Sequence, residues 1–260
     1  MRIALLATGL ILSGAMAGAS PVNGTGNLTS NVIFGSGNAN GSFSGVNNTT
    51  DSIELALRGK LRYDLNGNPQ AVYNYDGNRT YTFLASQSNA PDNRSVFNFD
   101  WSINSDSENL FAFAGDLNDL TYLMSIDYDP TAAVGSVVAF DPINRPYADH
   151  AIGTDTTPTS GGTVAQSVAE YQSLIATNNV AQNSWNLGFF EPAGFDPQTP
   201  GIYTITLSAF AFDQQLATTS IDIVYVDDIV PVNPVPLPAS APLLLAAVGG
   251  AAWVGRRKRR

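Results

Sequence analysis

The sequence predicts an all-β protein, mainly antiparallel, with a central body of the β-sandwich or jelly-roll type. Apolar and polar residues alternate over many short runs, and Gly, Asn, Asp and Pro separate these runs. Helical spacing of apolar residues is visible at Thr163–Thr177, which predicts one short helix in the body. The 260 residues include no cysteine, so the fold must depend on its core and not on disulfides.

The clearest strand is Ser95–Ile103, where every second residue from Phe97 onward is aromatic or apolar and the residues between them are polar. A period of two places the two sets on opposite faces of a strand. We therefore expect one face of this strand to lie in the core and the other to be solvated.

Turn residues separate the other predicted strands. The turn at Asp76 and Gly77 between two aromatic runs predicts a β-hairpin, because glycine readily adopts the positive φ that such turns need. The further runs with strand character are Ile53–Tyr63, Ala71–Tyr75, Arg79–Ala85, Leu110–Ala114, Leu120–Tyr128, Ser136–Phe140, Ser184–Phe190, Ile202–Phe212 and Ser220–Val226.

Composition divides the chain into five segments. Residues 1–19 have the features of a signal peptide, and residues 20–52 are a Gly-, Asn- and Ser-rich arm, expected to be loosely ordered with one or two short strands. Residues 53–230 form the predicted sandwich domain, residues 231–236 a proline-rich linker, and residues 235–260 a C-terminal sorting signal that overlaps the linker. The body is long enough for one domain with a substantial core.

The N-terminal segment has the order of a secretory signal peptide. Arg2 precedes the apolar run Ile3–Leu12, which predicts a signal helix, and small residues follow as far as Ser20. Ala17 and Ala19 form the best cleavage site for signal peptidase, with cleavage after Ala19; Ala15 and Ala17 are the competing pair. Export from the cytoplasm is the expected result.

The C-terminal segment predicts a membrane anchor. Leu237–Gly255 is an apolar run of 19 residues, which spans roughly 28 Å as a helix, close to the thickness of a hydrocarbon core. Five consecutive basic residues follow it, and by the positive-inside rule they stay in the cytoplasm and leave the body outside. These are Arg256, Arg257, Lys258, Arg259 and Arg260.

The sequence at the start of this segment is Val235, Pro236, Leu237, Pro238 and Ala239. With the apolar run and the basic tail, it resembles the VPLPA variant of PEP-CTERM sorting signals, over about 26 residues. The resemblance implies recognition by an exosortase, a membrane transpeptidase of Gram-negative bacteria that cuts near the proline motif. It also implies a transient stay in the inner membrane, a final place at the cell surface or in the extracellular matrix, and an association with exopolysaccharide and biofilm. The motif is a substrate and not a catalytic site.

One position departs from the commonest form of this motif. Leu237 stands where a glutamate usually lies between the two prolines. The departure implies a variant exosortase, and it leaves the point of cleavage open.

Charge excludes nucleic acid as a partner. The net charge is −10, but six of the twelve basic residues lie in the two terminal segments, so the body carries six basic and 22 acidic residues. Its net charge of −16 repels phosphate backbones, which bind through clustered Lys and Arg. Such a surface suits a soluble protein that attracts divalent cations.

One acidic loop has the spacing of a cation site. Asp64, Asn66 and Asn68 follow the pattern D-x-N-x-N, which begins many calcium loops, because calcium prefers oxygen ligands. Pro69 stands where an EF-hand has glycine, so an ordinary turn is the competing interpretation. If calcium binds here, it should raise the melting temperature. No other cofactor is expected.

No catalytic pattern is present in the sequence, so we expect a non-enzymatic surface or matrix protein with a structural or adhesive role. His150 is the sole histidine, and no serine lies in a G-x-S-x-G motif. A carbohydrate-binding module and a secreted polysaccharide-active enzyme stay open as alternatives. The first would use exposed aromatic side chains to stack on sugar rings, for which the candidates are Tyr73, Tyr75, Tyr81 and Trp185.

Overall fold

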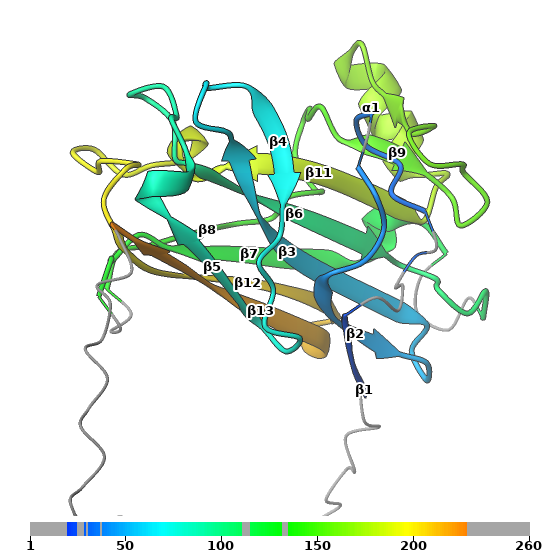
Figure 1. Ribbon diagram of the computed structural model, residues 1–260. Helices are drawn as coiled ribbons and strands as arrows, with labels where there is room; N and C mark the ends of the chain where they lie inside the picture. The colour runs from blue at the N-terminus through cyan, green and yellow to red at the C-terminus, as the bar shows by residue number, and fades with distance from the viewer. Residues whose placement is uncertain are drawn as a thin grey trace, which may run out of the picture. The chain divides into compact units, whose positions relative to one another are not determined.

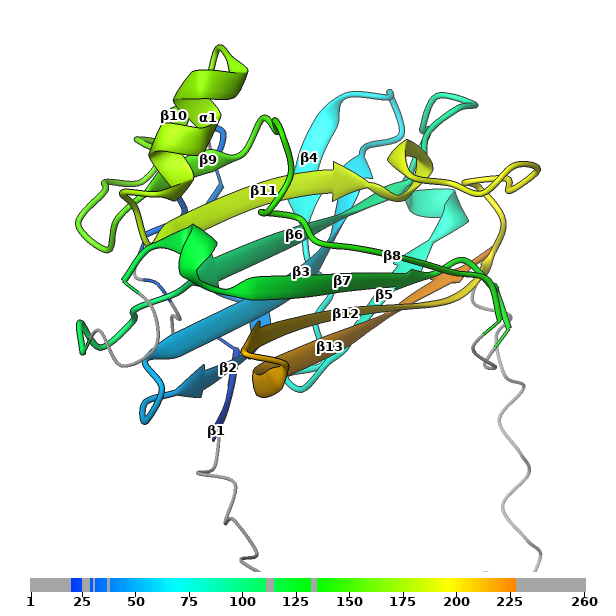
Figure 2. The same cartoon turned by 180° about the vertical axis from the view of Figure 1, so that it is seen from behind.

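A computed structural model of the protein describes residues 20–24, 29, 31–36, 38–110, 115–131 and 135–227. They form two β-sheets in two layers, with all strand pairs but one antiparallel, which confirms the all-β expectation (Figures 1 and 2). The predicted signal helix, the apolar C-terminal helix and strand residues 111–114 lie outside the described residues.

The larger sheet, sheet A, has eight strands. Seven of them follow one another across the sheet, and the eighth, β4 (Pro69–Val72), pairs with β3. The order of the seven is β1 (Ser20–Gly24), β2 (Phe43–Asn48), β3 (Ile53–Tyr63), β6 (Phe97–Asn104), β11 (Val180–Asn186), β9 (Ala151–Gly153) and β10 (Thr163–Val164).

The smaller sheet, sheet B, has five strands, and its first pair, β5 with β13, is the parallel one. The order across it is β5 (Thr80–Leu84), β13 (Gln214–Val226), β12 (Gly201–Ala211), β7 (Thr121–Asp127) and β8 (Val137–Phe140). Helix α1 (Val168–Ile175) lies inside the predicted helical segment and is capped by Ser167, whose side chain accepts the N–H of Glu170. Three short 3₁₀ turns complete the described elements: η1 (Ala85–Gln87), η2 (Leu117–Asp119) and η3 (Leu187–Phe189).

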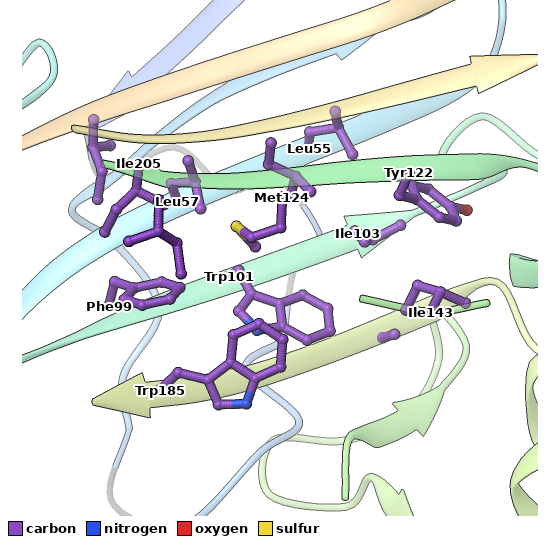
Figure 3. Packing of buried hydrophobic residues seen from close by; sticks show 14 of the residues in the cluster. Leu55, Leu57, Phe99, Trp101, Ile103, Tyr122, Met124, Ile143, Trp185 and Ile205 are labelled. Carbon is purple, nitrogen blue, oxygen red and sulfur yellow. The ribbon is translucent and has the colours of Figure 1, made fainter. Parts of the chain in front are cut away.

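The core lies between the two sheets. Inward-facing residues of β3 and β6 meet those of β7 and β12, and Figure 3 shows the close packing of Leu57, Phe99, Trp101, Met124 and Ile205. All five are fully buried. The period-two pattern of the sequence therefore identified the inner face of β6 correctly.

The outer face of β6 is buried as well, so the expectation of a solvated face is wrong. Asp100 has no exposed surface, and Asn98 and Ser102 are 7% and 5% exposed. The cover comes from the predicted arm, where Val32, Ile33, Phe34 and Phe43 form a second buried cluster with Ala56, Ala151 and Val180 of sheet A. The structure thus differs from a loosely ordered arm, because four apolar residues are enough to hold this segment against the sheet.

The predicted hairpin at Asp76 is a crossover between the sheets. The turn itself forms, since the Asp76 side chain accepts the N–H groups of Asn78 and Thr80. However, β4 belongs to sheet A and β5 to sheet B, and a single bridge joins Tyr75 to Tyr81. Gly59 on β3 allows the crossover, because a Cβ atom there would lie 2.9 Å from the Tyr81 ring.

No helix among the described residues combines the length and the apolar character needed to cross a membrane.

Candidate functional site

Basic residues are concentrated on β3. Arg58, Lys60 and Arg62 alternate along this strand and are half of the six basic residues of the body. Their spacing of two places them on one face, which is the outer face of sheet A. An acidic protein thus carries a basic row on one strand.

Two members of the row are paired with Asp100 of β6. The Arg58 Nε and Nη2 atoms donate to Asp100 Oδ2 at 3.0 and 2.7 Å, and Lys60 Nζ lies 2.9 Å from Asp100 Oδ1. The register of the sheet explains the geometry, because Arg58 lies directly opposite Asp100. The other oxygen therefore remains available to Lys60, which lies two residues further along β3 on the same face.

Arg58 is a structural residue. Its Nη1 donates to the carbonyl oxygens of Ala39 and Gly41 at 2.8 Å, and its guanidinium lies between the rings of Phe43 and Tyr73, at 4.1 and 4.2 Å from their centres. The side chain is fully buried, and four of its five N–H groups donate hydrogen bonds. It fastens the segment before β2 to the sheet.

The ion pairs determine the charge states here. Burial by itself would raise the pKa of Asp100, but the nearby Arg58 and Lys60 outweigh this and hold that pKa below its ordinary value. Burial lowers the pKa of Lys60, and the negative charge of Asp100 opposes that decrease. The group is therefore a charged, buried triad of two cations and one anion.

An open cleft of about 540 Å³ lies beside this triad. Lys60 lines it, and its wall crosses sheet A from β3 and β4 over β6 to β11. Most of the residues that bring polar atoms to the cleft are uncharged amides or hydroxyls. The polar lining includes Arg62, Gln70, Asn98, Asp149, Asn183 and Ser184.

Arg62 differs from the other two basic residues of β3. Its side chain is partly exposed, its guanidinium lies 5.9 Å from the centre of the Tyr63 ring, and it forms no ion pair with the residues that the structure describes. Arg62 therefore brings a full positive charge to the cleft that no described carboxylate neutralises.

Hydrogen bonds fix the polar floor of the cleft. Asn98 donates to Ser184 Oγ at 3.1 Å and accepts from Asn186 at 2.9 Å. At the β11 side, Asn183 Nδ2 lies within hydrogen-bonding distance of both Asp149 Oδ1 and His150 Nδ1, each at 3.2 Å. The cleft is thus lined by polar groups whose orientation is set before any ligand arrives.

The predicted calcium loop forms an Asx-type turn. Asp64 Oδ1 accepts the backbone N–H groups of Asn66 and Asn68 at 2.8 Å, and Asp64 Oδ2 accepts from the Asn68 side chain at 3.3 Å. The backbone hydrogen bond of Asn68 is the main reason that the pKa of Asp64 lies below its ordinary value. In the described part of the chain, no group of three or more His, Asp or Glu residues has a metal-binding arrangement. Calcium binding at this loop stays a prediction.

His150 is a core residue. Its Nε2 donates to the Pro142 carbonyl at 2.8 Å, so its Nδ1 is the acceptor for Asn183. Its ring packs edge-on against Trp101 with centres 4.8 Å apart. Burial is the main cause that lowers the pKa of His150 to about 4, so the ring is neutral at pH 7. A neutral ring enclosed by aromatic side chains is not placed to reach a substrate.

The four aromatic candidates have different positions. Tyr81 and Trp185 are core residues, Tyr75 stacks on Tyr81 with ring centres 4.8 Å apart, and Tyr73 covers Arg58. None of them lines the cleft. The motif residues Val235, Pro236, Leu237, Pro238 and Ala239 and the basic tail Arg256, Arg257, Lys258, Arg259 and Arg260 lie outside the described residues.

Two buried titratable groups predict opposite effects of pH on stability. Burial raises the pKa of Glu54 from 4.5 to about 7, despite its hydrogen bonds from Thr29. The contribution of Glu54 to the free energy of unfolding is fully present below pH 4.5 and is lost as the pH rises through 7. The contribution of His150 is fully present above pH 6.5 and is lost as the pH falls through 4. Each amounts to about 3 kcal/mol in the free energy of unfolding.

We expect Glu54→Gln to lose stability as the pH falls from 6.5 to 4, and His150→Gln to lose it as the pH rises from 4.5 to 7. The unmodified protein should vary less than either variant between pH 4.5 and 6.5, because the two effects oppose each other there. Urea unfolding across this range measures how the free energy of unfolding of each protein changes with pH, which gives one slope for each. Equal slopes in all three proteins would contradict the assignment.

Comparison with protein-family models, with curated proteins and with solved structures finds no match to this chain.

Proposed function

We propose that this chain is an exported, non-enzymatic protein of the cell surface or extracellular matrix, with a jelly-roll-like sandwich as its body. In this proposal, signal peptidase removes residues 1–19, and an exosortase-type transpeptidase processes the tail after a transient stay in the inner membrane. The observation that carries it is the order of the C-terminal segment: proline motif, apolar run and five basic residues. Each part has a physical role in that order, since the apolar run enters the membrane and the basic residues stop its transfer.

The proposed role of the body is structural or adhesive, in contact with exopolysaccharide. The polar cleft on sheet A supports binding, because it holds fixed amide and hydroxyl groups. The buried, neutral state of His150 speaks against a hydrolase that pairs a serine with a histidine base. It does not bear on a polysaccharide-active enzyme that uses two carboxylates.

The sorting step is tested at the motif. In cells, Pro236→Ala together with Pro238→Ala should leave membrane insertion intact, because the segment stays apolar, but should block cutting. Full-length protein should then accumulate in the inner membrane and be lost from the surface. Cell fractionation measures where the protein is located, and mass spectrometry of its C-terminus measures whether it has been cut.

The matched control is Pro231→Ala with Pro234→Ala, which removes two prolines from the linker outside the motif. Its protein should reach the surface normally. Neutral replacements of the five basic residues should weaken retention before cutting, and deletion of Ile3–Leu12 should leave precursor in the cytoplasm. Surface protein from unmodified cells that still ends at Arg260 would refute sorting and leave a plain anchor.

A further inference from the structure

We propose that the cleft on sheet A binds a polysaccharide segment that carries uronic acid, with the Arg62 guanidinium paired to the sugar carboxylate. This inference deepens the proposed function, on which it rests, because it names the ligand class of the exported body. Asp149, on the far side of β11 from Arg62, would accept hydrogen bonds from sugar hydroxyls.

The distribution of charge points to an anionic ligand. The body has a net charge of −16, yet three of its six basic residues follow one another on β3. Arg58 and Lys60 share the buried Asp100, so this triad of two cations and one anion carries one net positive charge. Arg62 brings one more positive charge to the cleft. A partly exposed guanidinium pairs with a planar carboxylate through two parallel hydrogen bonds.

The remaining lining favours a ligand rich in hydroxyl groups. Asn98, Asn183 and Ser184 supply neutral donors and acceptors, and their mutual hydrogen bonds hold them in place. The cleft crosses from β3 to β11, which is roughly 10 Å at the usual spacing of strands. This length accommodates more than one sugar ring along an open surface.

The same features disfavour other anions. A ligand with two charges at one position, such as a phosphate monoester, would find in Arg62 the one lining cation that has no ion pair among the described residues, and it would also face Asp149. An extended peptide would need free backbone groups at a strand edge. At the edge of β11 beyond its pairing with β9, the Ser184 N–H already donates to the Asn183 side chain at 2.7 Å.

Calorimetric titration of the full-length chain tests the proposal. The probes are oligomers of galacturonate, mannuronate and glucuronate, together with methyl-esterified oligogalacturonate, which keeps the rings and hydroxyls but has no charge. We expect at least one uronate oligomer to bind, binding to weaken with salt, and the methyl ester of a bound galacturonate oligomer to bind at least tenfold more weakly. Arg62→Gln should weaken the uronate complex at least tenfold.

Arg94→Gln is the matched control, because Arg94 also lies against an aromatic ring, 4.9 Å from the centre of Phe189, and does not line the cleft. It should bind as the unmodified chain does, and both variants should keep the melting temperature. The proposal is overturned if no uronate binds, if Arg62→Gln binds equally well while folded, or if polyglutamate binds as tightly with the same dependence on Arg62. Because tail processing is measured in cells, failure here leaves the sorting proposal intact, and failure there leaves this one testable on purified protein.

Discussion

Asp100→Ala is expected to lower the free energy of unfolding by about 3–5 kcal/mol, because it leaves two buried cations without their shared anion. Arg58 is fully enclosed between two rings, so its guanidinium cannot turn to water without opening the cover of sheet A, and the Lys60 side chain is only 4% exposed at the wall of the cleft. The variant should also loosen residues 38–42, because Arg58 fastens this segment through the carbonyl groups of Ala39 and Gly41.

Urea unfolding measures the loss, and Asp222→Ala is the matched control. Asp222 pairs with Arg79 at 2.9 Å, but the two side chains are 28% and 44% exposed, so breaking this pair should cost less than about 1 kcal/mol. Replacing all three members of the triad with apolar residues (Arg58→Met, Lys60→Met, Asp100→Leu) should recover much of the loss. Similar losses for Asp100→Ala and Asp222→Ala would show that burial does not govern the triad.

Trp101→Ala should cost about 3–5 kcal/mol, because it opens a cavity at the centre of the core. Trp101 has no exposed surface and packs against His150, Trp185 and Met124 (Figure 3). The neighbours come from both sheets, so they cannot close the space without moving the sheets together. Thermal and urea unfolding give the change.

Trp101→Phe separates the cavity from the polar group. The indole Nε1 of Trp101 is buried and has no hydrogen-bond partner among the described residues, which itself costs stability. Phenylalanine removes this N–H and keeps most of the apolar volume. Trp101→Phe should therefore lower the free energy of unfolding by much less than Trp101→Ala does. A loss as large as that of Trp101→Ala would mean that the indole nitrogen has a partner.

Local sequence pattern predicted the strands but not what packs on their outer faces. The alternation in β6 shows which residues share a face, and this is why Phe99 and Trp101 were assigned to the core. It does not show what packs on the other face, where Asn98 and Asp100 read as solvated although both are buried. Likewise the turn at Asp76 was predicted, but the change of sheet depends on the gap left by Gly59 on a distant strand.

The candidate site shows the same limit. The spacing of Asp64, Asn66 and Asn68 drew attention to a loop whose carboxylate bonds its own turn. The cleft carried a weaker signal, three basic residues at a period of two inside an apolar strand of an acidic protein. The basic row can be interpreted only with the register of the sheet, which places Asp100 opposite Arg58 and leaves Arg62 outside the paired residues. Register depends on tertiary structure and not on local sequence.

The parallel pair of β5 and β13 has a consequence for the order of folding. β5 has no partner in sheet B except β13, and Arg79 pairs with Asp222 across 143 residues of chain. Contacts this distant in sequence form slowly, since a long loop must close before they contribute. A chain that crosses a membrane N-terminus first would therefore expose Tyr81 and Phe83 of β5 until β13, the last described strand, has followed. In the export that we propose, the sandwich could therefore not close early and obstruct translocation, and chaperones outside the membrane would have their best opportunity to bind the chain during this interval.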